Sequence, residues 1–279
     1  MPRSTANTVP LCGLKKLDLF NERERTLLHN RVVLDDPRKT VKLSGIGLKT
    51  VATILFTNFR IWGHFAINII SLTPKGGLSV YSPTIIRNLG FSTITASNLS
   101  AVSNFGVCIL AILVAWTSDR TSVRGLLCLL CAAYSIIFAG VQYGVVKSDN
   151  VWLKYAILTL LNSGNAVSQS INDAWLSVNV AHPQERCVGL ALAVAGSNLG
   201  GLAGQNIFVK ADAPTYYHGF LRIICIYAAS IVMIGVMILF YWNENRHLTR
   251  SPSGLYVVTT DRAEAYAEDG REVKVKNQL

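Results

Sequence analysis

Six apolar segments alternate with short polar connections between residues 59 and 242 of this 279-residue chain. Each segment matches the ~20 residues that an α-helix needs to cross the hydrocarbon core of a bilayer. The pattern predicts an all-α membrane protein, a six-transmembrane-helix bundle. The expected spans are Phe59–Ile86, Asn98–Thr117, Gly125–Val146, Lys154–Val178, Cys187–Val209 and Phe220–Trp242.

Polar sequence flanks the predicted bundle on both sides. We expect residues 1–58 to form a cytoplasmic polar lead, residues 59–242 to form the transmembrane bundle, and residues 243–279 to form a cytoplasmic, disordered tail. Charged residues are frequent in both flanks and rare in the segments between them. The chain therefore divides into one membrane domain with two polar extensions.

Two of the six segments are not uniformly apolar. The first contains Pro74, Lys75, Gly76 and Gly77 in its middle, a combination that predicts a kinked or unwound helix. The fourth carries polar residues at steps of three and four, which places them on one helix face. Such a face either lines a hydrophilic path or makes hydrogen bonds between helices. Its polar residues are Asn162, Asn165, Gln169, Asn172 and Asp173.

Composition and charge agree with a membrane protein. Charged residues make up 15% of the chain, against about 25% in soluble domains. The net charge of +10 arises in the polar flanks and connections, without a basic stripe interleaved with aromatic residues, so we do not expect nucleic-acid binding. Twenty of the 26 Lys and Arg residues fall on one predicted side, which places both termini in the cytoplasm.

Several motifs resemble one family of transporters. Asp119, Arg120 and Arg124, between the second and third spans, fit the Gly-x-x-x-Asp-Arg/Lys-x-Gly-Arg-Arg/Lys loop of the major facilitator superfamily in part, since its first Gly and two further positions differ. Three other stretches resemble the fungal anion:cation symporter branch, which includes allantoate, nicotinate, pantothenate and biotin permeases. They are Ser82–Phe91, Asn198–Gly201 and Asp212–Tyr216.

The resemblance implies a fold and a function. The family has twelve spans, and this chain resembles the C-terminal six, so we expect one half of a major facilitator fold and a truncated half-transporter. The implied activity is proton-coupled secondary transport of a small organic anion, a carboxylate or vitamin-like compound, across the plasma membrane. The implied partners are the lipid bilayer, the anion, protons and the missing N-terminal six-helix half. The alternative is a non-transporting membrane fragment or a half-molecule that binds a partner.

Lys75, Asn165, Gln169 and Trp175 are the candidate substrate-binding residues. A lysine deep in a span either faces a water-filled cavity, where it would attract a carboxylate, or extends its ammonium group to the membrane surface. Asn165 and Gln169 belong to the polar face of the fourth span. Trp175 either stacks on a heterocyclic substrate or anchors the helix at the membrane interface.

Asp173 is the candidate proton-coupling residue, because it is the only acid well inside a predicted span. The alternative is an ordinary interfacial acid paired with His182 or Arg120. The loop residues Asp119, Arg120 and Arg124 are expected to act in a conformational switch or simply to form a positive-inside loop. Small residues at four-residue spacing favour close helix packing in the fifth span; they are Gly196, Gly200 and Gly204.

Catalytic chemistry is not indicated. The five histidines are scattered, and the sequence shows neither a phosphate-binding glycine loop nor paired carboxylates on a cavity face. The six cysteines mostly lie within apolar segments, as buried small hydrophobic residues do. We therefore expect neither an enzyme nor a protein with a cofactor or a metal ion.

Overall fold

The computed structural model describes residues 47–250 apart from 166, 181 and 182, together with Asn21, Arg23, Glu24, Thr26 and Leu27. Most of the predicted polar lead and all but the beginning of the predicted tail lie outside these residues. Within the long described part, the regular elements are all helical. They are α2 (Leu48–Thr57), α3 (Phe59–Asn88), α4 (Thr93–Thr121), α5 (Arg124–Val145), α6 (Val151–Gly164), α7 (Val167–Asn179), α8 (Pro183–Gly204), η3 (Lys210–Asp212) and α9 (Tyr217–Arg250).

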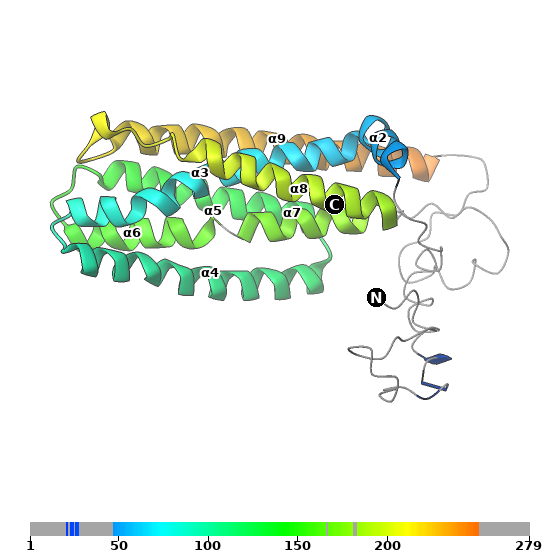
Figure 1. The fold of residues 1–279 in the computed structure, drawn as a ribbon, viewed down its shortest axis with the longest axis horizontal. Helices are drawn as coiled ribbons and strands as arrows, with labels where there is room; N and C mark the ends of the chain where they lie inside the picture. Colours follow the sequence, from blue (N-terminus) through cyan, green and yellow to red (C-terminus); the bar gives the residue numbers. More distant parts are fainter. Residues whose placement is uncertain are drawn as a thin grey trace.

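The long helices run side by side along one axis of the molecule (Figure 1). The α4–α5 and α7–α8 connections lie at the end that also holds α2, which we call the α2 end. The α3–α4, α5–α6 and α8–α9 connections lie at the opposite end, which we call the far end. The most extensive packing joins α3 to α8, and α5 packs on α9. Both of these contacts join helices that are far apart in the sequence.

Four described helices are long and apolar enough to cross a membrane: Thr93–Thr121, Arg124–Val145, Pro183–Gly204 and Tyr217–Arg246. They correspond to the predicted second, third, fifth and sixth spans. The predicted first and fourth spans are also helical, but neither meets this criterion of length and apolar composition. The criterion therefore does not confirm the count of six spans. Both of these segments carry the polar residues noted in the sequence.

Of the kink or the unwinding expected at Pro74, the structure does not show the unwinding. Instead of unwinding at Pro74, α3 continues as one helix of 30 residues, because an unsatisfied backbone group is costly in an apolar environment. The fourth span, predicted as continuous, is divided into α6 and α7 around Asn165. Asn165, the residue after α6, is buried, and its side-chain oxygen accepts a hydrogen bond from Tyr227 of α9.

The surface of the bundle is strongly apolar. Large hydrophobic side chains lie exposed along α4, where Phe105 is 71% and Ile112 is 69% exposed. Such a surface is unfavourable in water and matches the hydrocarbon of a bilayer. Together with the four apolar helices, it identifies a multi-pass membrane protein.

Candidate functional site

A polar cavity of about 470 Å³ lies between α3, α7 and α8. Lys75 and Ser79 line it from α3, Gln169 lines it from α7, and Asn198 and Gln205 line it from α8 and the residue that follows α8. Among the described residues around this cavity, Lys75 is the only one with a charge. The volume falls within the range of about 300–1,000 Å³ that holds small ligands. The cavity can therefore hold a small molecule with one negative group.

Glycines position the helix that carries Lys75. A Cβ on Gly77 would lie 2.6 Å from the carbonyl oxygen of Gly204, and a Cβ on Gly76 would overlap the backbone of Gly201. Glycines at 196 and 200 face α3 in the same way, against Phe65 and Ile69. Small residues allow two helix backbones to approach closely. The Pro-Lys-Gly-Gly sequence therefore marks the closest approach of α3 to α8, beside the cavity.

A second polar layer lies one helical turn from the cavity, towards the α2 end. Asn68, Asp173 and Ala193 each stand four residues from a cavity-lining residue on their own helix, which is about one turn of 5.4 Å. The Asn68 Nδ2 donates to Asp173 Oδ1 at 2.9 Å and to the Ala193 carbonyl at 3.0 Å. Asp173 is half-buried and lies one turn from Gln169 of the cavity.

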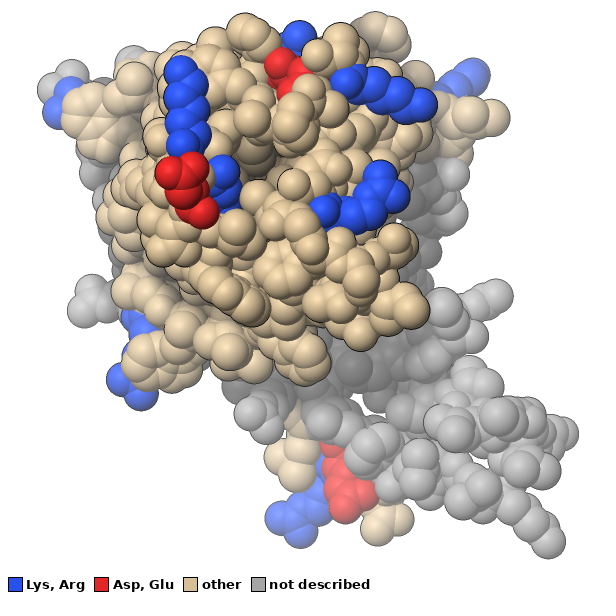
Figure 2. Space-filling view, turned by 90° about the vertical axis from the view of Figure 1, so that its left-hand side faces the viewer, with Lys and Arg blue, Asp and Glu red and all other residues tan. Residues whose placement is uncertain are grey.

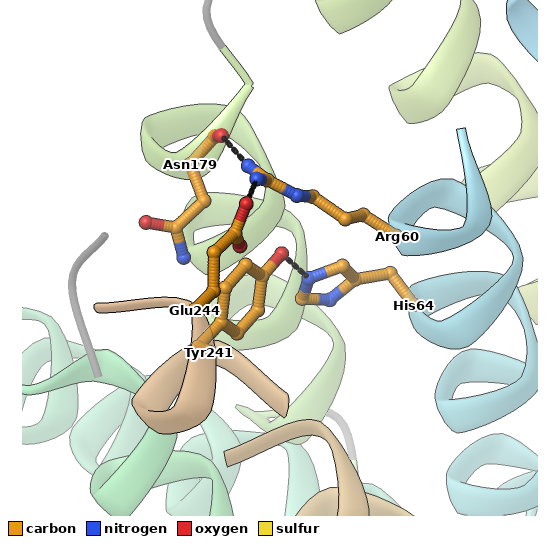
Figure 3. Close-up of polar contacts among 5 residues, drawn as sticks. All are labelled: Arg60, His64, Asn179, Tyr241 and Glu244. Carbon is orange, nitrogen blue, oxygen red and sulfur yellow. Dashed lines mark hydrogen bonds and ion pairs between the residues drawn. The ribbon is translucent and has the colours of Figure 1, made fainter. Parts of the chain in front are cut away.

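Further hydrogen bonds extend from this layer towards the α2 end. Asn172 Nδ2 donates to Asn68 Oδ1 at 2.8 Å, and Asn172 Oδ1 lies 2.7 Å from His64 Nδ1. His64 Nε2 lies 3.0 Å from the Tyr241 hydroxyl of α9 (Figure 3). His64, Asn172 and Tyr241 are all fully buried. These contacts connect α3, α7 and α9 through buried polar groups.

An ion pair lies at the α2 end of these contacts. Arg60 of α3 pairs with Glu244 of α9 and donates to the Asn179 carbonyl at the end of α7 at 3.1 Å (Figure 3). The Arg60 guanidinium also lies 5.7 Å from the centre of the Tyr241 ring. Because the pair is only partly exposed, water screens it less than a surface pair. It holds the ends of three helices together.

The structure brings some of the predicted substrate residues together and separates others. Lys75 and Gln169 line the same cavity. Asn165 does not line it and instead accepts the hydrogen bond from Tyr227. Trp175 is fully buried, with its ring in edge-on contact with His64 at 4.9 Å and close to Tyr241 at 5.4 Å.

Asp173 accepts a hydrogen bond from Asn68 of α3. Arg120 is exposed at the end of α4, and its guanidinium lies 4.7 Å from the centre of the Trp116 ring. His182 lies outside the described residues. Asp119 is also exposed, and Arg124 begins α5. The loop that these residues form lies at the α2 end of the bundle (Figure 1).

Sequence reasoning did not single out His64, Asn68, Ser79, Asn198 or Gln205 as site residues. His64 and Asn68 are two polar residues at four-residue spacing within an apolar segment, so they could have been found as a polar face of the first span. Ser79, Asn198 and Gln205 have no comparable pattern. Only the packing of α3 against α8 places them beside Lys75.

Metal binding has no support in the described part of the chain. No group of three or more His, Cys, Asp or Glu side chains there is placed to hold a metal ion.

The far end carries Lys and Arg side chains with acidic ones among them (Figure 2). One of these acids, Asp212, accepts a hydrogen bond at 3.0 Å from the backbone of Gly219 in the first turn of α9, where a negative charge is favourable.

Comparison with known proteins identifies transporters as relatives. The chain is 26% identical over 90% of its length to an uncharacterized transporter of Saccharomyces cerevisiae, of which it covers 46%. It is 27% identical over 68% of its length to an MFS-type transporter of Penicillium expansum, of which it covers 36%. It is 30% identical over 61% of its length to the high-affinity nicotinic acid transporter of S. cerevisiae, of which it covers 31%. No protein-family model matches the chain.

The chain spans less than half the length of these three relatives. A putative uncharacterized transporter of S. cerevisiae is matched over 85% of its own length, at 28% identity. The described residues form a multi-pass, all-α membrane protein, and the relatives are named as transporters, two of them of the MFS type. The similarity does not single out the anion:cation symporter branch. The similar proteins are named as transporters and not as enzymes.

Proposed function

We propose that this chain forms one half of a secondary transporter of the major facilitator type, which moves a small organic anion by alternating access. In such transporters, substrate sites lie near the middle of the membrane, between two halves. The proposal includes an orientation with both termini in the cytoplasm and a location in the plasma membrane. A six-helix N-terminal half, as the longer relatives could supply, would complete the path.

One observation carries the substrate class: among the described residues that line the polar cavity of about 470 Å³, Lys75 alone has a charge. Lys75 is partly buried; an ammonium group within a membrane span is costly unless it is paired or hydrated, and a carboxylate would supply the missing charge. The surrounding amides and hydroxyls can both donate and accept hydrogen bonds. The substrate class is therefore a small carboxylate, and nicotinate is a suitable probe because one relative is named as its transporter.

Asp173 is the proposed proton-coupling group. It lies one helical turn from Gln169 of the cavity and accepts a hydrogen bond from Asn68. A carboxyl group in this position can bind a proton in one state and release it in another while an anion occupies the cavity. If uptake by an Asp173→Asn variant kept the pH dependence of the unsubstituted chain, Asp173 would have no part in coupling.

The first experiment measures binding of nicotinate and of its neutral analogue nicotinamide to the full chain in lipid nanodiscs. In Lys75→Gln we expect nicotinate affinity to fall about tenfold or more, because a hydrogen bond to a charged group contributes about 1.5–3 kcal/mol. Nicotinamide binding should stay unchanged. Lys210→Gln, at an exposed site of the far end, is the control. Unchanged nicotinate affinity in Lys75→Gln would refute an anion site at Lys75.

A second candidate is a half-molecule that binds a membrane partner without transporting. The observation in its favour is the coverage, since the chain matches less than half of several transporters. Uptake of nicotinate by cells that express the chain, compared with cells that also express an N-terminal half of a longer relative, separates the two. Uptake in neither case, together with stable association of the two halves, favours the partner-binding candidate.

A further inference from the structure

A series of hydrogen bonds runs from Tyr241 through His64, Asn172 and Asn68 to Asp173. Two backbone carbonyls determine which group donates and which accepts in each of these bonds. Amide oxygen and nitrogen atoms must be assigned from their partners. The Ala193 carbonyl can only accept, so the Asn68 atom 3.0 Å from it is the nitrogen. The His64 carbonyl can only accept, so the Asn172 atom 3.1 Å from it is also the nitrogen. Both amide orientations follow without reference to the histidine ring.

These orientations determine the protonation of His64. The oxygen of Asn172 faces the His64 Nδ1 at 2.7 Å, and because that oxygen can only accept, Nδ1 carries a hydrogen. The other ring nitrogen, Nε2, lies 3.0 Å from the Tyr241 hydroxyl. In the neutral ring this nitrogen accepts, so the hydroxyl donates to it. A second hydrogen on the ring would place a charge among fully buried residues.

Every donor in this series then points towards Asp173. Tyr241 donates to His64, His64 to Asn172, Asn172 to Asn68, and Asn68 to Asp173 Oδ1. Hydrogen bonds aligned in one direction polarise and strengthen each other. The remaining amide hydrogens of Asn68 and Asn172 go to the two backbone carbonyls, so the side chains have little freedom to reverse.

We propose that His64, held as the neutral Nδ1–H form, is a positioning residue for Asp173 and acts through Asn172 and Asn68. The series holds Oδ1 of Asp173 as an acceptor beneath the Lys75 cavity and leaves Oδ2 as the oxygen that takes the proton. This inference rests on the proposed role of Asp173 in proton coupling. It assigns a function to a buried histidine that touches neither the cavity nor the surface.

The arrangement limits the route by which a proton reaches Asp173. Two side-chain amides separate the carboxylate from His64, and a neutral amide does not readily accept a proton and pass one on. The proton therefore exchanges with Asp173 from the cavity side. At the other end of the series, Arg60 and Glu244 lie beyond Tyr241 and pair with each other.

The direct test is nitrogen NMR of the full chain in nanodiscs with labelled histidine, where His64→Gln identifies the His64 signals. We expect a neutral ring with the hydrogen on Nδ1. Asn68→Leu and Asp173→Asn should each shift the Nδ1 signal, and Asp149→Asn, at an exposed acid of the far end, should not. A hydrogen on Nε2, a doubly protonated ring, or no response to Asn68→Leu would overturn the proposal.

A second measurement tests the link to function. Titration calorimetry in buffers of different ionisation heat counts the protons taken up as nicotinate binds. His64→Leu should reduce this proton uptake, and His64→Gln should retain it because its amide can donate to Asn172. In an Asp173→Asn background, His64→Leu should have no further effect, since the histidine acts through the carboxylate.

The outcomes separate the two proposals. An effect of His64→Leu that persists in the Asp173→Asn background, or no effect in either background, overturns the positioning role and leaves the anion site at Lys75 intact. Absence of nicotinate binding, or of any proton uptake by the unsubstituted chain, overturns the proposed function, and with it the positioning role. The NMR signal then still decides whether the aligned series exists.

Discussion

At the scale of single residues, burial decides which polar or aromatic side chain can meet a ligand. Lys75 and Gln169 reach a cavity, whereas Trp175 is fully buried against His64 and Tyr241. A ring enclosed in this way contributes to packing and cannot stack on a substrate without a large rearrangement. The sequence leaves both roles open for Trp175, because it shows a residue type and not its neighbours.

Trp175→Phe is expected to destabilise the protein and to leave nicotinate affinity unchanged. A smaller ring leaves unfilled volume in the core and costs about 1–3 kcal/mol. Thermal unfolding and nicotinate binding in nanodiscs measure the two effects. Trp116→Phe, where the tryptophan is 57% exposed, should change neither. A loss of affinity without a loss of stability would restore Trp175 as a substrate-binding residue.

At the scale of helices, the contact between α3 and α8 organises the site. The glycines of the two helices let their backbones meet, which places Lys75 beside Asn198 and Gln205. The sequence indicates close packing of the fifth span from the spacing of Gly196, Gly200 and Gly204. It does not indicate that the partner is the Pro-Lys-Gly-Gly segment, because spacing within one helix contains no information about its neighbour.

Gly204→Ala is expected to lower the free energy of unfolding by about 1–3 kcal/mol, the usual cost of overpacking. The added methyl group would overlap the carbonyl of Thr73, a backbone atom that cannot turn away. Thermal unfolding in detergent provides the measurement. Gly140→Ala is the matched control, because a Cβ there meets nothing within 4 Å and alanine favours the helix. Equal melting temperatures for the two variants would contradict the contact.

At the scale of the whole molecule, the two ends of the bundle are distinct. The α4–α5 loop with Arg120 and Arg124 and the α7–α8 connection share their end with α2, and the far end carries the α3–α4, α5–α6 and α8–α9 connections (Figure 1). The distribution of Lys and Arg predicts that the α2 end faces the cytoplasm. The α4–α5 loop, α2 and the C-terminal end of α9 lie at the same end of the bundle, and we therefore expect them on the same side of the membrane.

Single cysteines introduced on a cysteine-free background test the orientation. Ser122→Cys, in the α4–α5 loop, should resist a membrane-impermeant thiol reagent in intact cells and react after permeabilisation. Ser148→Cys, in the α5–α6 connection, should react in intact cells. Both residues lie in short turns between helices. The reverse labelling pattern would place the α2 end outside the cytoplasm.

The sequence by itself determined the membrane class, the helical segments and the polar character of two of them. These properties depend on local composition, because ~20 apolar residues cross a bilayer wherever they occur. Tertiary structure decided the rest: that α3 stays helical through Pro74, that the fourth span divides at Asn165, and that Lys75 meets amides from α8. Each of these depends on which helix packs beside which, since a neighbour supplies or withholds the hydrogen-bond partner that a polar or strained residue needs.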